Sequence, residues 1–396
     1  MANDQPSIEF HSNIPFYRDE RVIRAFAQIV SAILIIGFLI WAVLNFLQAA
    51  EARNMTLTFD FLKEAAGFPI SNPPIEYDPS MTYGRAFMVG LVNTLIVAIS
   101  GIITATIVGT LIALARLSSN WLLSRIALIF IEFHRNIPLL VLLFIWYFVA
   151  FGQLPLVKES IVWPGPTFIN KRGVYITWPR LTDSSTPFVT LVGIGILLAI
   201  IVYIVLRRRR ALTGQETYYG QISLGILILF PVIGWFAAGG APFQLDIPAL
   251  EGFNYKGGLR LTPEFAALFL GLSLYTAAFI AEVVRAGIQA VDKGQIEAAR
   301  AVGLSTSQVL SLVIMPQALR IIIPPMISQY LNLTKNSSLA LAIGYQEVFS
   351  VGKIAINQAG RAVPVFVLVM LTYLSLSLLT SFVLNLYNRR IQFVAR

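Results

Sequence analysis

The chain contains no cysteine and only two histidines, His11 and His134, among its 396 residues. This excludes disulfides, iron–sulfur clusters and thiolate metal sites, and it excludes a metal site built from several histidines. No segment has the phosphate-binding pattern Gly-x-x-x-x-Gly-Lys-Ser/Thr, so the chain cannot hydrolyse ATP by the usual machinery. No cluster of His, Asp or Glu suits catalysis. We therefore predict no catalytic residue and no metal ligand.

Charge is also scarce in this sequence. Only 12% of the residues are charged and 57% are hydrophobic, whereas a soluble domain has about 25% charged and about 45–50% apolar residues. The apolar residues gather in runs that are long enough to cross a membrane. The expected fold class is therefore all-α and integral to the membrane. We predict eight spans, at residues 25–48, 86–115, 122–150, 188–206, 220–238, 264–288, 317–344 and 363–387.

The basic residues predict how these spans are oriented. They gather before the first span and after the fourth and eighth, at Arg18, Arg21, Arg24, 207–210 and 389–390. Eight spans place all three groups, and both termini, in the cytoplasm. The first span is longer than a signal-peptide core, so we expect it to remain uncleaved. The net charge of +9 then indicates contact with anionic membrane lipid and not with nucleic acid.

Three long segments lie outside the membrane in this arrangement, at residues 49–85, 151–187 and 239–263. They are rich in proline, glycine and aromatic residues, which suit ordered turns and the aromatic belts of membrane interfaces. The sequence leaves open whether they act as lids or as scaffolding.

A polar, basic stretch at residues 291–325 interrupts the apolar pattern. A helical pattern containing Glu297, Ala298 and Ala299 leads to Gly303, which suits a turn because glycine accepts positive φ at little cost. After it, Ser305 and Gln308 have the spacing of a capping box. Pro316 is then expected to open the next membrane helix. Such an exposed short helix favours docking into the groove of a soluble partner, although an ordinary helix–turn–helix loop would show the same spacing.

This stretch resembles the cytoplasmic signature of bacterial ABC importer permeases. That signature reads Glu-Ala-Ala, three residues, Gly, nine residues, then Ile-x-Leu-Pro. The chain has its first part at 297–299, then Gly303, and then Val313-Ile314-Met315-Pro316, so Val313 and Met315 are conservative departures. The segments 132–140, 275–287 and 333–344 also resemble core helices of the polar-amino-acid branch. The enlarged layout is similar to permeases of general L-amino-acid importers.

The resemblance implies a five-helix permease core at residues 86–150 and 262–390, with a coupling region at 291–316. Residues 1–85 would add a cytoplasmic N-terminus, the first span and a periplasmic segment, and 151–261 would be an insertion with two further spans. It also implies partners in the bacterial inner membrane. These are a cytoplasmic ATPase dimer that uses ATP and magnesium, a second homologous permease subunit and a periplasmic amino-acid-binding protein. The resemblance favours a heterodimer, but the sequence does not separate it from a homodimer.

Charged residues inside spans are costly and usually face protein or water. Glu282 and Arg285 lie one turn apart near the inner end of a span, and Glu132 and Arg135 have the same spacing. Both sets can pair at i, i+3. We interpret them as structural pairs, with a cytoplasmic gate as the alternative.

Lys335, Asn336, Ser337 and Ser338 lie in the outer half of a span. The pair Pro324-Pro325 is expected to disrupt the helix before them, and broken helices at such depth often line a cavity. Amide and hydroxyl groups suit a zwitterionic amino acid. The hypothesis is that Asn336, Ser337 and Ser338 line the substrate path, with Leu339 and Leu341 as an apolar gate. Interhelical hydrogen bonding explains the same residues equally well.

Two other classes of protein remain open on the sequence alone. A self-sufficient channel or ion-coupled transporter would carry small polar solutes without an ATPase. A membrane-embedded lipid enzyme would need catalytic residues at one interface, and we find none. Which amino acids are carried is not determined by the sequence.

Overall fold

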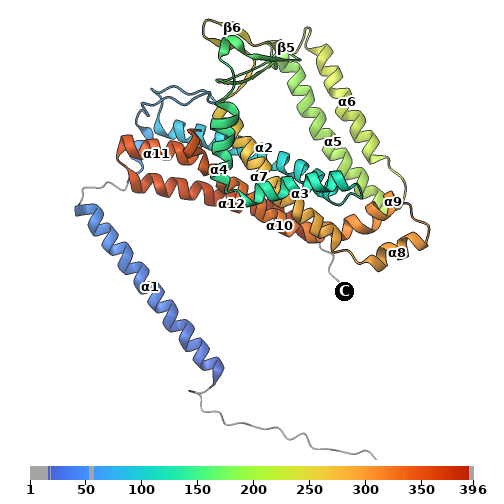
Figure 1. Ribbon diagram of the computed structural model, residues 1–396, viewed down its shortest axis with the longest axis horizontal. Helices are drawn as coiled ribbons and strands as arrows, with labels where there is room; N and C mark the ends of the chain where they lie inside the picture. The colour runs from blue at the N-terminus through green and yellow to red at the C-terminus, as the bar shows by residue number, and fades with distance from the viewer. Residues whose placement is uncertain (1–16, 18, 53–57, 392–396) are drawn as a thin grey trace, which may run out of the picture.

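The computed structural model describes residue 17 and residues 19–52 and 58–391, and it is dominated by long helices (Figure 1). Seven helices are long and apolar enough to cross a membrane, or eight if one bent pair counts as a single span. This confirms the predicted all-α membrane class. Arg18 and the predicted cytoplasmic tail at 1–16 lie outside the described residues. The long helices are α1 Glu20–Ala52, α2 Tyr83–Arg116, α3 Trp121–Asn136, α5 Ser185–Thr213, α6 Tyr219–Ala237, α7 Pro263–Gln289, α10 Met315–Asn336 and α12 Ala362–Ile391.

Helices α2 and α7 form the centre of the helix core. Thr82 and Thr262 cap their N-termini by accepting hydrogen bonds from backbone N–H groups, and Pro263 occupies the first turn of α7. Gly109 lets the two helices approach closely, because a Cβ there would lie 2.7 Å from the Ala277 carbonyl oxygen. Small residues at such crossings are typical of helices packed in membranes. Helix α10 packs against α7 in the same core.

The predicted span at 122–150 is sharply bent. Helix α3 ends at Asn136, α4 (Leu139–Phe144) follows, and residues 145–151 continue as a π-helical turn. The angle at the break is 106°. The cause lies at Ile137, which precedes Pro138 and has the extended φ of −99° and ψ of 130° that a following proline favours.

The predicted break at Pro324-Pro325 is wrong. Helix α10 runs through both prolines from Met315 to Asn336. Proline's φ suits a helix, and membrane helices tolerate the lost hydrogen bonds where neighbouring helices pack against them. The helix instead tightens after Asn336, where Ser337–Ile343 form a 3₁₀ helix that ends at Gly344 with φ +79°. Helix α11 (Val348–Ala359) and α12 follow.

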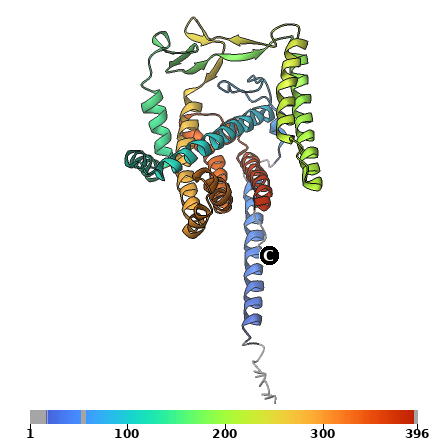
Figure 2. The same cartoon turned by 90° about the vertical axis from the view of Figure 1, so that its right-hand side faces the viewer.

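The insertion at 151–261 contains short β-strands that no sequence pattern predicted. One antiparallel sheet has the order β1-β2-β3-β8. Strand β4 pairs with β5 across the base of α5 and α6, and β6 and β7 form a hairpin. We call the end of the molecule that carries them the strand side (Figure 2). The strands are β1 Ile161–Trp163, β2 Thr167–Asn170, β3 Gly173–Ile176, β4 Trp178–Leu181, β5 Phe243–Asp246, β6 Ala249–Glu251, β7 Asn254–Lys256 and β8 Leu259–Leu261.

Residues 58–82 also lie on the strand side and pack over the ends of α2 and α11. The segment includes the 3₁₀ turn η2 (Asp60–Lys63) and buries Phe61, Phe68 and Ile70 in a second apolar cluster with residues of α2, α11 and α12. Gln346 ties it down, because its side chain accepts from the Ser71 N–H at 2.7 Å and donates to the Pro69 carbonyl at 2.9 Å.

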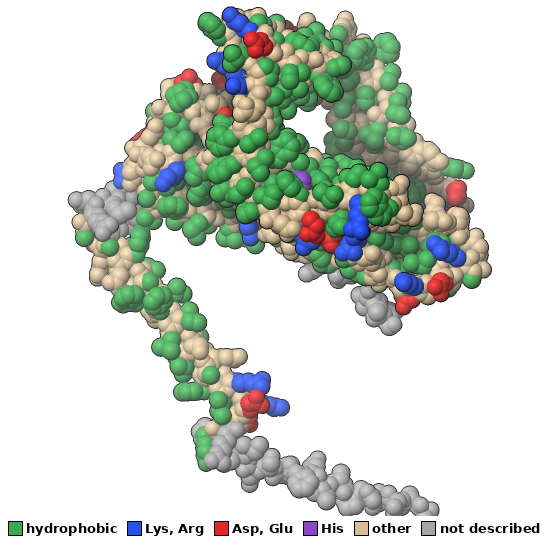
Figure 3. Space-filling view, in the orientation of Figure 1, with side chains coloured by type: hydrophobic (Ala, Val, Ile, Leu, Met, Phe, Trp, Pro, Cys, Tyr) green, Lys and Arg blue, Asp and Glu red, His purple; other side chains and the backbone are tan. Residues whose placement is uncertain are grey.

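Helices α5 and α6 form a hairpin beside the core. Gly195 faces Phe230, and Gly234 faces Phe188, at distances that leave no room for a Cβ. Most of their apolar side chains are exposed, and the apolar window of α1 has no buried residue. Figure 3 shows an open space between this hairpin and the core, with few charged side chains on the helices. These three helices are therefore available for lipid or for another subunit.

Helices α5 and α7 both start at the strand side and run away from it (Figure 1). The end of α5 carries Arg207–Arg210, and α7 leads to the short helices α8 (Lys293–Ala301) and α9 (Thr306–Gln308). We call this end the opposite side. The structure thus places the arginine cluster and the predicted coupling region on the same side of the molecule.

Candidate functional site

The first candidate site is α8, on the opposite side. Asp292 caps this helix by accepting a hydrogen bond from the Gly294 N–H at 2.6 Å. Ala299 is buried, whereas Glu297 and Ala298 are exposed. The two alanines therefore have different roles. Ala299 packs α8 against the rest of the protein, and Ala298 leaves the outer face of the helix flat.

The turn after α8 is as open as its outer face. Gly303 has φ +85°, which confirms the predicted left-handed turn. A Cβ at this position would meet no atom within 4 Å. The side chain of Val302 beside it is 77% exposed. We call Glu297, Ala298, Val302 and Gly303 together the α8 surface.

The helix after this turn confirms the capping box, and Pro316 lies in the first turn of α10. Ser305 accepts from the Gln308 N–H at 3.4 Å, and Gln308 accepts from the Ser305 N–H at 2.9 Å. Val309–Ile314 then form a π-helical turn, and the helical run continues unbroken from Thr306 to Ile343. Pro316 therefore lies in the first turn of α10, as predicted, although the π-helical turn joins this helix to α9 without a break. A π turn shifts the hydrogen-bond register, and such turns are frequent at functional sites.

Helix α8 contacts the start of α10 directly. The side chain of Gln317 donates hydrogen bonds to the Gln295 side chain and, at 3.1 Å, to the Val313 carbonyl. Ile296 packs against the main apolar cluster of the core. A displacement of α8 would therefore reach α10 without passing through a flexible loop.

The predicted contact between Glu282 and Arg285 is present. It is bidentate, with Arg285 Nε 3.1 Å and Nη2 2.7 Å from the two carboxylate oxygens of Glu282. Arg285 Nη1 also donates to Gln289 at 2.7 Å. Arg116 and Arg135 are close enough to interact electrostatically with Glu282. The carboxylate thus joins α7 to charges from α2 and α3 at the opposite side, and whether this group gates the path stays a prediction.

The predicted pair of Glu132 and Arg135 does not form. Asn136 Nδ2 donates to Glu132 at 2.9 Å, and no ion pair joins the two charged side chains, both of which the structure describes. The guanidinium of Arg135 instead lies over the Phe279 ring, 5.5 Å from its centroid. Helix α3 packs against α7, so the Phe279 ring of α7 competes with Glu132 for the guanidinium.

The predicted path residues face different directions. Lys335 is exposed, and Asn336 and Ser338 are half-buried. Lys335 and Ser338 line a groove along α12. Ser337 is fully buried, and its hydroxyl donates to the Thr334 carbonyl at 2.7 Å. Leu339 packs against the core, whereas Leu341 is exposed. In this conformation Lys335 and Ser338 offer polar groups to the groove, whereas Asn336 is not among its lining residues. The assignment of Asn336, Ser337, Ser338 and Leu339 to a path stays a prediction.

Sequence reasoning missed Glu347, a fully buried carboxylate. It caps α11 by accepting from the Phe349 and Ser350 N–H groups at 3.0 and 2.8 Å, and it also accepts from the Tyr373 hydroxyl of α12. Burial raises the pKa of the Glu347 carboxyl, although these hydrogen bonds oppose the rise. Beside it, the Thr94 hydroxyl of α2 accepts from the Val348 N–H at 3.2 Å. The sequence does carry a signal for this role, because an acidic residue just before an amphipathic helix is typical of an N-cap.

No metal or cofactor position emerges from these sites. Within residues 19–52 and 58–391, no group of three or more His, Asp or Glu side chains converges. The contacts between α8 and α10 can transmit a displacement of α8 into the helix core. The polar groups beside the groove can form hydrogen bonds with a small solute.

Comparison with known proteins places most of the chain in one family. The model of the binding-protein-dependent transport system inner membrane component family matches residues 105–393. A general L-amino acid transport system permease protein of Rhizobium johnstonii is 42% identical over 94% of this chain and 92% of its own length. A putative amino-acid ABC transporter permease protein of Escherichia coli is 44% identical over 93% of this chain and 94% of its own length. A glutamate/glutamine/aspartate/asparagine transport system permease protein of Rhodobacter capsulatus is 38% identical over both full lengths.

Proposed function

Because the chain belongs to the family of binding-protein-dependent transport system inner membrane components, we propose that it is the permease subunit of an ATP-driven importer that carries amino acids across the bacterial inner membrane. The proposed cargo class rests on relatives whose names refer to amino-acid transport and which match nearly the whole chain. ATP and magnesium are used by a partner, since this chain has no phosphate-binding loop.

The observation that carries the proposal is the α8 surface. It presents Glu297, Ala298 and Val302 outward, on the same side as Arg207–Arg210. Clusters of arginine beside a span favour the cytoplasm. The opposite side is thus cytoplasmic in the proposal, as are both termini, and the strand side is periplasmic. Docking of a short helix into a groove would bring a cytoplasmic ATPase dimer against α8.

The proposed mechanism uses the contacts that leave α8. ATP-driven closure of the ATPase dimer displaces α8, and Gln295 and Gln317 pass the movement to α10. The charge cluster around Glu282 moves with α7 as the cytoplasmic end opens or closes. The groove beside Ser338 alternates between the two sides, with Leu341 as the exposed part of an apolar gate. The translocation step involves no covalent chemistry.

The proposed assembly contains a second permease subunit and a periplasmic amino-acid-binding protein. The groove along α12 and the exposed apolar faces of the long helices leave room for a membrane partner. A homologous but different subunit is the proposed partner. In this assembly residues 86–150 and 262–390 form the permease core, and 151–261 is the insertion that reaches the periplasm.

Affinity purification of the chain in mild detergent tests the assembly. We expect an ABC ATPase and a second permease to co-purify, and we expect proteoliposomes of that complex to take up amino acids only with ATP and the loaded binding protein. Transport of amino acids by the purified chain alone, driven by an ion gradient, would contradict the proposal and favour a self-sufficient transporter.

The path assignment predicts that Asn336→Ala combined with Ser338→Ala weakens uptake. Each lost hydrogen bond to a charged ligand group costs about 1.5–3 kcal/mol, so we expect at least about a tenfold lower uptake at limiting substrate. The measurement is radiolabelled uptake by the purified complex.

Ser223→Ala is the matched control, because the Ser223 hydroxyl is buried in α6 and has no hydrogen-bond partner among the residues that the structure describes. It should leave uptake unchanged. If the double variant assembles normally and retains the uptake and substrate preference of the parent, Asn336 and Ser338 do not line the path.

A further inference from the structure

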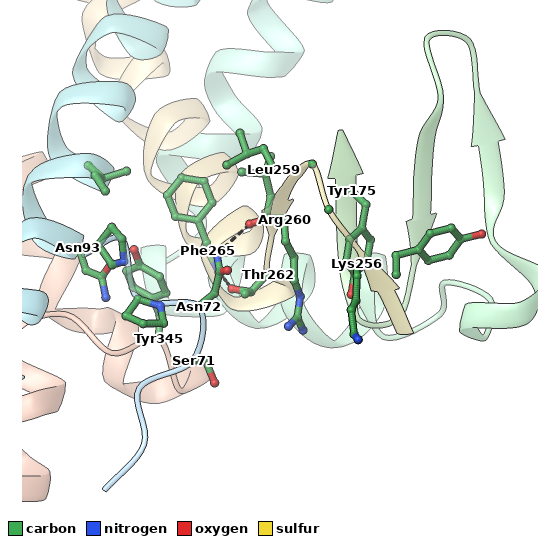
Figure 4. Close-up of a pocket in the computed structure, with 17 residues that line it drawn as sticks. Ser71, Asn72, Asn93, Tyr175, Lys256, Leu259, Arg260, Thr262, Phe265 and Tyr345 are labelled. Atoms are coloured by element: carbon green, nitrogen blue, oxygen red, sulfur yellow. Dashed lines mark hydrogen bonds between the residues drawn. The ribbon is translucent and has the colours of Figure 1, made fainter. Parts of the chain in front are cut away.

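A cavity of about 600 Å³ lies on the strand side, between the insertion and the helix core (Figure 4). Its floor contains Asn93 of α2, Phe265 of α7 and Tyr345. Residues 71–74 form one wall, and residues 255–262 of the insertion form another. The volume falls in the range of about 300–1,000 Å³ that is typical of sites for small ligands. The insertion thus encloses space directly above the ends of the core helices.

The cavity is cationic. Arg260 and Lys256 line it, and no acidic residue is among its described lining residues. In Figure 4 both side chains point toward the same open end of the cavity. The Lys256 ammonium pairs with Glu251 at 2.7 Å and is highly exposed, whereas Arg260 is half-buried and has no acidic partner among the described residues.

The guanidinium of Arg260 is oriented before any ligand binds. Its Nε and Nη2 atoms donate to the Arg172 carbonyl at 3.3 and 3.2 Å, and its Cζ lies 5.7 Å from the centroid of the buried Tyr175 ring. Nη1 has no hydrogen bond to any described residue. A planar guanidinium with free N–H donors is well suited to a carboxylate.

An acceptor lies across the cavity from this donor. Asn93 is 5% exposed, and its Nδ2 donates to the Gln346 carbonyl at 2.8 Å. Its side-chain oxygen has no partner among the described residues. Phe265 and Tyr345 lie between Asn93 and Arg260 (Figure 4), so a ligand that spans the two polar groups would rest on aromatic surface. This arrangement suits an amino acid whose carboxylate lies on Arg260 and whose polar side chain extends over the aromatic surface toward Asn93.

The walls are held together by hydrogen bonds between distant segments. Asn72, at φ +49°, donates from Nδ2 to the Arg260 carbonyl at 3.0 Å. Gly258 allows the insertion to fold closely, because a Cβ there would lie 2.5 Å from the Ile176 carbonyl oxygen. The cavity is thus a built feature of residues 69–75, the insertion and the core.

We infer that this cavity is a periplasmic vestibule that binds a free amino acid, with the ligand's carboxylate on Arg260 and its side chain extended toward Asn93, before the amino acid enters the membrane path. The inference rests on the proposed function. Its floor reaches Tyr345, which directly follows Gly344 at the end of the 3₁₀ helix that carries Ser338. A solute released at the strand side would therefore meet this vestibule first.

Because the chain has no cysteine, one introduced cysteine can report on the vestibule. Ser71→Cys places a thiol at the cavity wall, and Ser80→Cys is the control, on the same segment but not among the lining residues. The assembled complex in detergent is treated with a membrane-impermeant thiol reagent. Labelling of this chain is measured with and without L-glutamine, L-glutamate or gamma-aminobutyramide, which is glutamine without its carboxyl group.

We expect the amino acids to slow labelling of Ser71→Cys and not of Ser80→Cys, while gamma-aminobutyramide gives no protection. Adding Arg260→Gln should raise the glutamine concentration needed for protection by about tenfold or more, the loss expected for a hydrogen bond to a charged group. Arg260→Lys keeps the positive charge and should retain part of the protection, which separates ligand binding from misfolding.

The opposing outcomes are distinct. Failure of both amino acids to protect Ser71→Cys, in a complex that still imports amino acids with ATP, overturns the vestibule and leaves the proposed function standing. Protection by ligand-free binding protein but not by amino acids also overturns it, because the cavity would then dock a protein. A wild-type complex with no ATP-dependent amino-acid uptake instead overturns the proposed function.

Discussion

Replacing Gly303 with arginine is expected to abolish ATP-driven uptake while the chain still inserts and folds. Gly303 has φ +85° and lies at the open end of the α8 surface. A side chain there costs about 1–2 kcal/mol of backbone strain, which alone would not unfold the protein. It would, however, project into the space that the ATPase must occupy. Central contacts of an interface are worth about 2 kcal/mol or more, so uptake and substrate-stimulated ATP hydrolysis should fall by at least about tenfold.

Gly214→Arg is the matched control for this experiment. Gly214 ends α5 at φ +70°, a Cβ there would also meet no atom within 4 Å, and the residue lies on the opposite side too. It therefore carries similar strain without touching the α8 surface, and it should leave uptake close to that of the parent. Normal uptake and normal stimulated ATP hydrolysis in Gly303→Arg would remove the α8 surface from the coupling mechanism.

Glu347→Ala is expected to destabilise the protein more than any other single carboxylate change described above. It removes the cap of α11 and leaves buried N–H groups of Phe349 and Ser350, and the Tyr373 hydroxyl, without their acceptor. The lost cap, which comprises the two N–H groups, costs about 1 kcal/mol, and the Tyr373 hydroxyl left unpaired costs about 1–3 kcal/mol. We therefore expect the free energy of unfolding to fall by about 2–4 kcal/mol. The measurement is the unfolding temperature of the complex in detergent, which should be lower.

Two further variants serve as comparisons for Glu347→Ala. Glu347→Gln keeps a side-chain acceptor and should be milder, because burial already raises the pKa of this carboxyl and disfavours its charged form. Glu159→Ala changes an exposed glutamate in the insertion and should leave the unfolding temperature unchanged. Equal unfolding temperatures for Glu347→Ala and the parent would show that the buried network does not hold α11 to α12.

The local features of the coupling region could be predicted because they depend on neighbours in sequence. The turn at Gly303, the capping box of Ser305 and Gln308, and the contact of Glu282 with Arg285 all join residues within four positions of one another. Backbone geometry at this range follows from residue type. The same reasoning failed for Glu132 and Arg135, because Phe279 of another helix competes for the guanidinium.

Features that depend on distant segments could not be predicted in this way. The continuity of α10 through Pro324-Pro325 depends on packing against α7. The strands of the insertion are three or four residues long, too short for an alternating pattern to separate them from turns. The acceptors and donors around Glu347 come from α11 and α12, and nothing in the sequence brings Tyr373 to it.

The sequence by itself determined that this chain spans a membrane, that it carries no Gly-x-x-x-x-Gly-Lys-Ser/Thr phosphate-binding pattern, and that a turn at Gly303 is followed by a capping box of Ser305 and Gln308. These conclusions follow from composition and from spacing along one stretch of chain. Only the tertiary structure decided which of Asn336, Ser337 and Ser338 face open space, that Glu347 is buried, and that Arg260 and Asn93 face one cavity. Burial and convergence are properties of segments far apart in the sequence, and packing alone brings them together.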